Sequence, residues 1–172
     1  MSDDYVDRIL EQWGRERPDL DVSPMGVIGR LSRLTRHLER SIEETFQQHG
    51  LGVGGFDVLA ALRRAGKPYR LSPTKLYNSL LISSGAMTNR IDRLEQQGLV
   101  SRAPDPHDRR SILVALTPKG KRTIDSAVTE HIDKEHGLLS PLSNSQREDL
   151  AKLLRKLLVS LEASVSDDRQ VS

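Results

Sequence analysis

The sequence contains no cysteine among its 172 residues. Disulfide frameworks, thiolate metal sites and thiol-based redox sensing are therefore excluded, and we expect a cytoplasmic location. The chain also lacks the run of roughly 18 apolar residues that a membrane span needs. Its first residues, Met1 to Asp4, are acidic and do not show the basic-then-apolar order of a signal peptide. We therefore expect no association with a membrane.

Sequence motifs of enzymes are missing as well. The chain has no Gly-rich phosphate loop, no cysteine nucleophile and no G-x-S-x-G motif. His131, Glu135 and His136 could suggest a metal site, but they lack the H-E-x-x-H spacing, and a solvated helix explains them better. We expect no catalytic residue, no metal site and no cofactor.

The net charge of +2 conceals a strongly uneven distribution along the chain. Residues 63–122 hold 13 lysines and arginines against 4 acidic residues, an excess of +9, so the remaining segments sum to −7. A basic middle within an acidic frame indicates a nucleic-acid face, because phosphate neutralisation dominates that kind of affinity. A merely solvated basic face is the alternative interpretation.

Hydrophobic periodicity predicts a mainly α-helical protein with one small β-hairpin, arranged as a winged helix-turn-helix. The hairpin strands are expected at 99–102 and 112–116, separated by a loop rich in Pro and Asp. We expect the following segments: an N-terminal extension helix within 1–21, dimerisation helices within 22–50 and 117–163, a winged helix-turn-helix lobe at 51–116, and a disordered tail at 164–172.

The helices at the two ends of the chain carry more leucine than one core of this size can absorb. One stripe runs from Ile28 to Phe46, and another from Leu150 to Leu161. Such stripes are most simply buried against a second copy of the chain, which predicts a homodimer. A single all-helical domain is the alternative.

The expected helix at 84–97 has the pattern of a DNA-recognition helix. Met87, Ile91 and Leu94 should face inward. The residues expected on its exposed face are Ser84, Thr88, Asn89, Arg90 and Arg93. Side chains of these types reach base edges or phosphates from a helix in the major groove, so we predict that this set contacts DNA.

The hairpin tip adds a second candidate DNA contact. Asp108, Arg109 and Arg110 lie in the turn between the two expected strands, where an arginine could enter the narrow minor groove. Asp108 could hold Arg110 in place through a charge-assisted hydrogen bond. A solvated turn with a weak surface ion pair is the alternative.

These segments together resemble a known family. The matching motifs are Leu94 to Val100, Asp105 to Arg110, Val114 to Thr117, and Gly120. They are similar to those of the MarR family of bacterial transcription regulators, over roughly residues 25–163. The resemblance implies a homodimer joined through its terminal helices, and an inverted-repeat operator released by small anionic or phenolic ligands.

A helix with a tryptophan ahead of this region resembles the urate-responsive branch of that family. The branch implies a urate site made by a tryptophan, an aspartate, an arginine seven residues later and an arginine of the first wing strand. Trp13, Asp57, Arg64 and Arg102 match that pattern. Arg64 would attract the anion, Trp13 would stack on it and Asp57 would be repelled by it. Arg102, tied to Asp57, would carry the change toward the recognition helix.

Each ligand residue also has a plainer interpretation. Trp13 could simply pack the extension helix against the core, and Asp57 and Arg64 could simply lie on the same face of one helix. Arg102 could contact phosphate instead. We therefore expect a dimeric DNA-binding regulator, in most cases a repressor, released by urate or a related anion. The alternatives are a phenolic or aromatic carboxylate ligand, and a winged-helix protein-interaction module.

Overall fold

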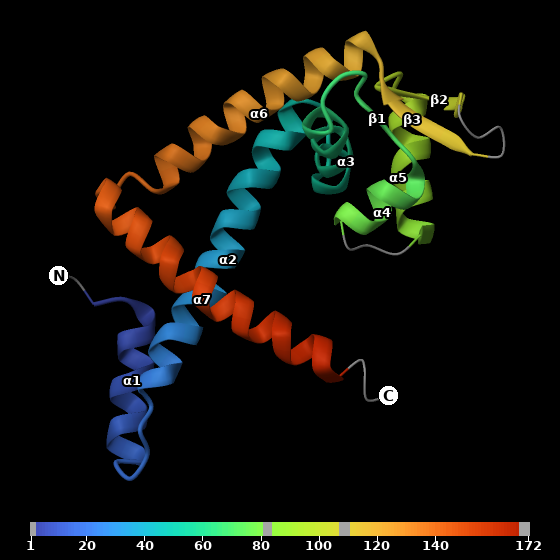
Figure 1. Ribbon diagram of the computed structural model, residues 1–172. Coiled ribbons are helices and arrows are strands. Elements are labelled where there is room, and N and C mark those ends of the chain that lie inside the picture. Colours follow the sequence, from blue (N-terminus) through green and yellow to red (C-terminus); the bar gives the residue numbers. More distant parts are fainter. Residues whose placement is uncertain (1–2, 81–83, 107–110, 169–172) are drawn as a thin grey trace. The chain divides into compact units, whose positions relative to one another are not determined.

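The computed structural model describes residues 3–80, 84–106 and 111–168 (Figure 1). Its helices are α1 (Tyr5–Glu16), α2 (Ser23–Gln48), α3 (Val53–Arg64), α4 (Pro73–Leu80), α5 (Ser84–Gln96), α6 (Pro118–Leu138) and α7 (Asn144–Asp168). Its strands are β1 (Arg70–Leu71), β2 (Val100–Pro104) and β3 (Ile112–Leu116). The chain divides into two units, residues 1–134 and residues 135–172. The expected winged helix-turn-helix, from α3 through β3, is confirmed.

The sheet has three antiparallel strands in the order β1-β3-β2. The expected hairpin is β2 and β3, in which Arg102 lies opposite Val114. The additional strand β1 pairs Leu71 with the other side of Val114. Two residues are too few to show the alternation that identifies a strand in a sequence, which explains why β1 was not expected.

Aromatic rings join α2, α3 and α6 in the core of the first unit. Phe46 and Phe56 stack with ring centroids 3.9 Å apart, and the His131 ring lies 5.2 Å from each of them. The largest fully buried side chains come from α3, α4, α5, α6 and the sheet: Leu59, Leu62, Leu76, Met87, Ile91, Ile124, Val58, Val100 and Val114. This core fixes the position of α5 relative to α3 and the sheet.

The start of α6 is held tightly against the end of α5. The Thr117 hydroxyl donates to the carbonyl oxygen of Gly98 at 2.8 Å, and the Gly120 amide donates back to the Thr117 hydroxyl at 2.9 Å. A Cβ atom on Gly120 would overlap the carbonyl oxygen of Leu99. Glycine is therefore required at this close approach of two backbones.

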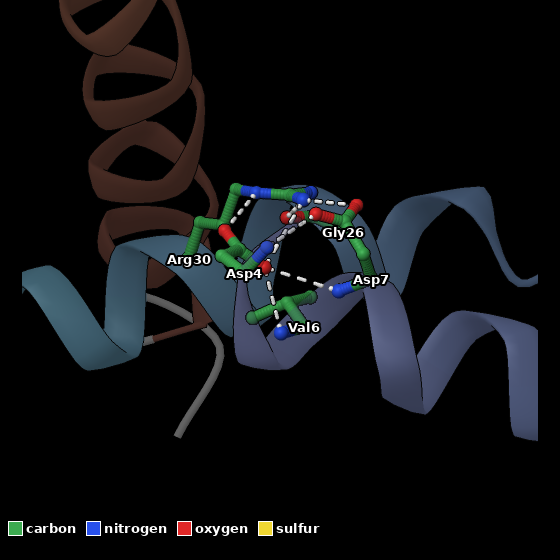
Figure 2. A network of polar contacts seen from close by, with 5 residues as sticks. All are labelled: Asp4, Val6, Asp7, Gly26 and Arg30. Atoms are coloured by element: carbon green, nitrogen blue, oxygen red, sulfur yellow. Dashed lines mark hydrogen bonds and ion pairs between the residues drawn. The ribbon is translucent and has the colours of Figure 1, made fainter. Parts of the chain in front are cut away.

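Helix α1 begins with a capping box and is anchored on α2 by one arginine (Figure 2). The Asp4 carboxylate accepts hydrogen bonds from the amides of Val6 and Asp7, at 2.7 and 3.0 Å. The Arg30 guanidinium on α2 donates to Asp4 at 2.9 Å, to Asp7 at 2.5 Å and to the Gly26 carbonyl at 3.2 Å. One side chain therefore ties the first turn of α1 to α2.

Two apolar contacts show that α1 runs antiparallel to α2. Val6 is 3% exposed and lies over Gly29, while Leu10 reaches Gly26. Both glycines let the helices approach closely, since an added Cβ would meet these side chains at 3.3 Å. Helix α1 therefore docks on α2, as a short amphipathic helix that is marginal alone in water must dock on another element.

The second unit contains helix α7, which continues to Asp168. Residues 164–168 are therefore helical, and the expectation of a disordered tail is wrong for them; residues 169–172 lie outside the described part. The large apolar side chains that α7 exposes are Leu150, Leu153, Leu154, Leu157, Leu158, Val159 and Leu161. In the described ranges, every helix falls short of the length or hydropathy of a membrane span.

Candidate nucleic-acid interface and ligand pocket

Helix α5 has one buried and one exposed face, as its sequence predicts. Met87, Ile91 and Leu94 are at most 2% exposed and pack into the core. Thr88, Asn89 and Arg93 are exposed on the other side. Ser84 begins the helix. The element before α5 is α4, which packs against both α3 and α5. This is the arrangement in which a helix-turn-helix presents its second helix to the major groove.

Arg90 departs from the expected exposed set. It is half-buried, and its guanidinium group lies over the α-carbon of Gly54 on α3, where any Cβ would overlap the arginine Nε and Cζ atoms. Its Nη1 atom is buried and has no hydrogen-bond partner in the described part of the chain. A buried cationic donor without a partner is costly, and such a group is typical of a ligand site.

Asp57 lies one turn after Gly54 on α3 and is half-buried. Burial raises the pKa of its carboxyl group, and the positive charges of Arg90 and Arg64 oppose that shift. Arg90 has the larger of the two electrostatic effects. The spacing of Asp57 and Arg64 in the sequence suggests that these two residues act together. In the structure, the arginine with the larger effect on the pKa of Asp57 is Arg90, which belongs to α5. Arg64 itself is exposed.

A polar cavity of about 290 Å³ opens beside Arg90, where α3 begins. Its lining residues are Gly50, Leu51, Gly52, Gly54, Gly55, Arg90, Arg93, Leu94 and Gln97. Gly52 caps α3 without a side-chain hydrogen bond, so the first amides of the helix add positive potential to that of the two arginines. Together these groups favour a small anion. Four glycines within residues 50–55, two before α3 and two in its first turn, are the sequence signal that could have located this cavity.

Arg102 on β2 holds the wing to α5. Its guanidinium group forms ion pairs with Asp92 and Glu95, and its backbone amide donates to Glu95 at 3.1 Å. The expectation that Arg102 is tied to Asp57 is therefore wrong, because two carboxylates on α5 engage it instead. These acids lie one turn apart on the recognition helix, and nothing in their local sequence distinguishes them from surface charges.

Trp13 is 41% exposed near the end of α1. Its helix packs on the first half of α2, around Arg30, whereas α3 meets α2 at Phe46. Those two points lie roughly 24 Å apart along the α2 axis. Because α1 runs antiparallel to α2, Trp13 lies farther still from α3. A single chain therefore does not bring Trp13 together with Asp57 and Arg90.

The predicted wing residues Asp108, Arg109 and Arg110 lie outside the described residues. The strands on either side are paired up to Pro104 and Ile112, and the Asp105 amide donates to the Ser111 carbonyl at 2.9 Å. Within the described residues, no group of three or more histidine or acidic side chains is placed to hold a metal ion.

Comparison with known proteins gives consistent matches. Residues 49–111 match a sequence model described as MarR family. The chain is 43% identical over 152 residues to the HTH-type transcriptional regulator PecS of Dickeya dadantii, covering 88% of this chain and 92% of PecS. A mutant MarR from E. coli, solved in complex with operator DNA, superposes with a TM-score of 0.67 at 26% identity, covering 85% of this chain and 97% of MarR.

A second solved structure carries information about a ligand. BpsR of Bordetella bronchiseptica superposes with a TM-score of 0.66 at 27% identity, covering 76% of this chain and 91% of BpsR. Its DNA binding is described as regulated by 6-hydroxynicotinic acid. That compound is a planar heteroaromatic carboxylate.

Proposed function

The chain belongs to the MarR family of DNA-binding transcription regulators, and on that premise we propose that it is a dimeric repressor released from its operator by a planar organic anion such as urate. The protein is not an enzyme. The matches favour DNA binding over the alternative of a winged-helix protein-interaction module. The observation that carries the ligand proposal is the buried Nη1 atom of Arg90, unpartnered in the described part of the chain, beside Asp57.

The DNA contacts follow from the exposed face of α5. Thr88, Asn89 and Arg93 would reach base edges or phosphates in the major groove, together with Ser84. Arg109 and Arg110 of the wing would contact the adjacent minor groove, with Asp108 as the orienting partner. Two such helices in a symmetric dimer require half-sites about 10 base pairs apart, so the operator should be a pseudo-palindrome.

The anion would bind to Arg90 in competition with Asp57. Its negative charge would satisfy the unpartnered guanidinium donor and would repel the Asp57 carboxylate. Arg90 belongs to α5, so a shift of its side chain is transmitted directly to the recognition helix. Release of DNA requires only that the anion binds the shifted arrangement more tightly than the DNA-bound one.

Arg102 would extend this coupling to the wing. Because it pairs with Asp92 and Glu95, movement of α5 is accompanied by movement of β2. Helix α5 is thus held on one side by Arg90 and on the other by two acids. Both DNA-reading elements would then change position together when the ligand binds.

The aromatic wall of the site would come from the second protomer. Trp13 lies too far along α2 from Asp57 in one chain, so stacking on the ligand requires the partner subunit's Trp13. A planar heteroaromatic anion fits this combination of a cation and an indole ring. The BpsR ligand has the same chemistry and is the observation that favours an aromatic carboxylate as the alternative to urate.

Operator release tests the proposal. Arg90→Gln should leave operator binding near the parent value and abolish release by urate, whereas Arg64→Gln serves as the matched control and should respond like the parent. Asp57→Asn should bind urate but release DNA poorly, because the repelled charge is gone. Calorimetry gives ligand affinity, and mobility shift gives DNA release. Parent-like release by Arg90→Gln would refute the site.

Ligand identity is tested separately. A thermal-shift screen of the parent protein with urate, xanthine, salicylate and protocatechuate should raise the midpoint for the ligand that binds the native state. A response to salicylate or protocatechuate without one to urate would select the aromatic carboxylate alternative. Weak salt dependence and no sequence preference in DNA binding would contradict the regulator itself.

A further inference from the structure

Helices α1 and α2 enclose a groove of about 480 Å³ that the DNA and ligand contacts proposed above do not use. Its floor and walls are mostly apolar, and its lining residues are Tyr5, Val6, Ile9, Pro24, Met25, Ile28, Gly29, Ser32, Arg33 and Arg36. A groove of this volume falls within the range of small-molecule sites. The apolar side chains Met25 and Ile28 are 44% and 62% exposed.

One end of the groove is strongly basic. Arg33 and Arg36 line it, and the same two residues with His37 and Arg40 line an adjoining hollow. Among the described residues, no acidic side chain lines either cavity. Arg40 pairs with Glu44, whereas Arg33 and Arg36 are like charges three residues apart on one helix face and repel each other. An anion bound between these two arginines would relieve that repulsion.

Both arginines at the groove are held in place by the protein. The Arg33 guanidinium lies over the Tyr5 ring, with its Cζ atom 4.8 Å from the ring centroid. The Arg36 Nε atom donates to the Ser32 carbonyl at 3.3 Å. Asp4 and Asp7, at the start of α1, are engaged by Arg30. The groove is therefore an apolar channel that ends in positioned positive charge.

We propose that this groove binds an amphipathic anion, whose apolar body lies over Ile9 and Met25 and whose carboxylate or sulfonate meets Arg33 and Arg36. Charge complementarity favours this occupant, because Arg33 and Arg36 offer positive charge at one end of a mostly apolar groove. The site involves neither Arg90 nor Asp57, so it is independent of the anion site proposed above.

Fluorescence of anilinonaphthalene sulfonate, itself an amphipathic anion, tests the groove in the intact protein. Decanoate should displace this probe, and decanol, which lacks the charge, should displace it much less. Ser32→Glu adds a carboxylate beside the two arginines and should weaken decanoate binding about tenfold or more. Ser32→Gln has the same size without the charge and should bind decanoate like the parent. Arg90→Gln should also bind it unchanged.

Three results would overturn the proposal. Equal displacement by decanoate and decanol would show that no cation takes part. Equal decanoate binding by Ser32→Glu and Ser32→Gln would place the probe elsewhere. Probe binding that grows as the protein is diluted into monomers would show that a second copy occupies the groove. Each outcome leaves the DNA-release experiment with Arg90 unaffected.

Discussion

The guanidinium group of Arg90 on α5 lies directly over the α-carbon of Gly54 on α3. A glycine lets Arg90 take this position, because a Cβ atom on residue 54 would overlap the arginine Nε and Cζ atoms. The contact brings the recognition helix and the start of α3 together at the cavity beside Arg90. It also places a positive charge of α5 close enough to Asp57 to influence its pKa.

Gly54→Ala should displace Arg90 and impair the ligand response. The overlap involves the end of a flexible side chain, so the fold should survive with a small change in the thermal midpoint. We expect the anion concentration needed for DNA release to rise, while operator affinity without ligand stays close to that of the parent. Gly14→Ala is the control, because nothing lies within 4 Å of its added Cβ. An unchanged release curve for Gly54→Ala would contradict this role.

Arg102→Gln should loosen the wing. The variant removes ion pairs to Asp92 and Glu95, which are partly exposed, so we expect a loss of about 1–2 kcal/mol in unfolding free energy. Operator affinity should fall as well, because β2 is no longer fixed to α5. Urea denaturation and mobility shift measure the two effects. Arg40→Gln removes the exposed pair with Glu44 and should change neither.

Gly120→Ala should strongly destabilise the fold. Its Cβ would overlap the Leu99 carbonyl oxygen, and this backbone atom, directly before β2, cannot move aside as a side chain can. We expect a loss of about 2–3 kcal/mol in thermal or chemical unfolding. Gly137→Ala, with open space around its Cβ, should instead stabilise by up to about 1 kcal/mol. Equal effects of the two substitutions would rule out the close approach.

Asp57 and Asp125 should respond to pH with opposite signs. Burial raises the pKa of Asp57, so its contribution to stability is full at acidic pH and is lost as pH rises through its folded pKa. Hydrogen bonds from Lys121 and Arg63, both 2.6 Å long, lower the pKa of Asp125. Its contribution is present at neutral pH and is lost as pH falls through that lowered value.

The two asparagine variants measure this difference. Asp57→Asn should gain stability relative to the parent as the pH is raised from acidic to neutral. Asp125→Asn should be less stable than the parent at neutral pH, and the gap should close toward acidic pH. Urea denaturation at several pH values gives both curves. Parallel curves for the two variants would contradict the assigned environments.

Leu157→Glu should convert the dimer to monomers. Leu157 is 47% exposed in the middle of the apolar row on α7, and a buried carboxylate there would be left without a partner in a helix-to-helix interface. Analytical ultracentrifugation gives the mass at matched concentration. Lys152→Gln changes the net charge by the same amount on the same helix and should remain dimeric. A dimeric Leu157→Glu protein would exclude α7 from the interface.

Periodicity in the sequence determined the helices, the β2–β3 hairpin and the buried face of α5. Met87, Ile91 and Leu94 recur at helical spacing, and side chains at that spacing lie on one face whatever surrounds the helix. The docking of α1 followed for a related reason, since a short amphipathic helix is marginal alone in water. These are local properties of the chain, so they can be predicted from the sequence before the tertiary structure is known.

Only the tertiary structure decided the partners of the charged residues. Arg90 looked like another exposed cation of α5, yet it lies on Gly54 from a different helix. Arg102 pairs with Asp92 and Glu95, and Asp57 is influenced more by Arg90 than by Arg64, its neighbour on α3. Long polar side chains reach several alternatives, and which one they meet depends on how elements distant in sequence pack. That choice depends on the core, where Phe46 and Phe56 bring α2 and α3 together.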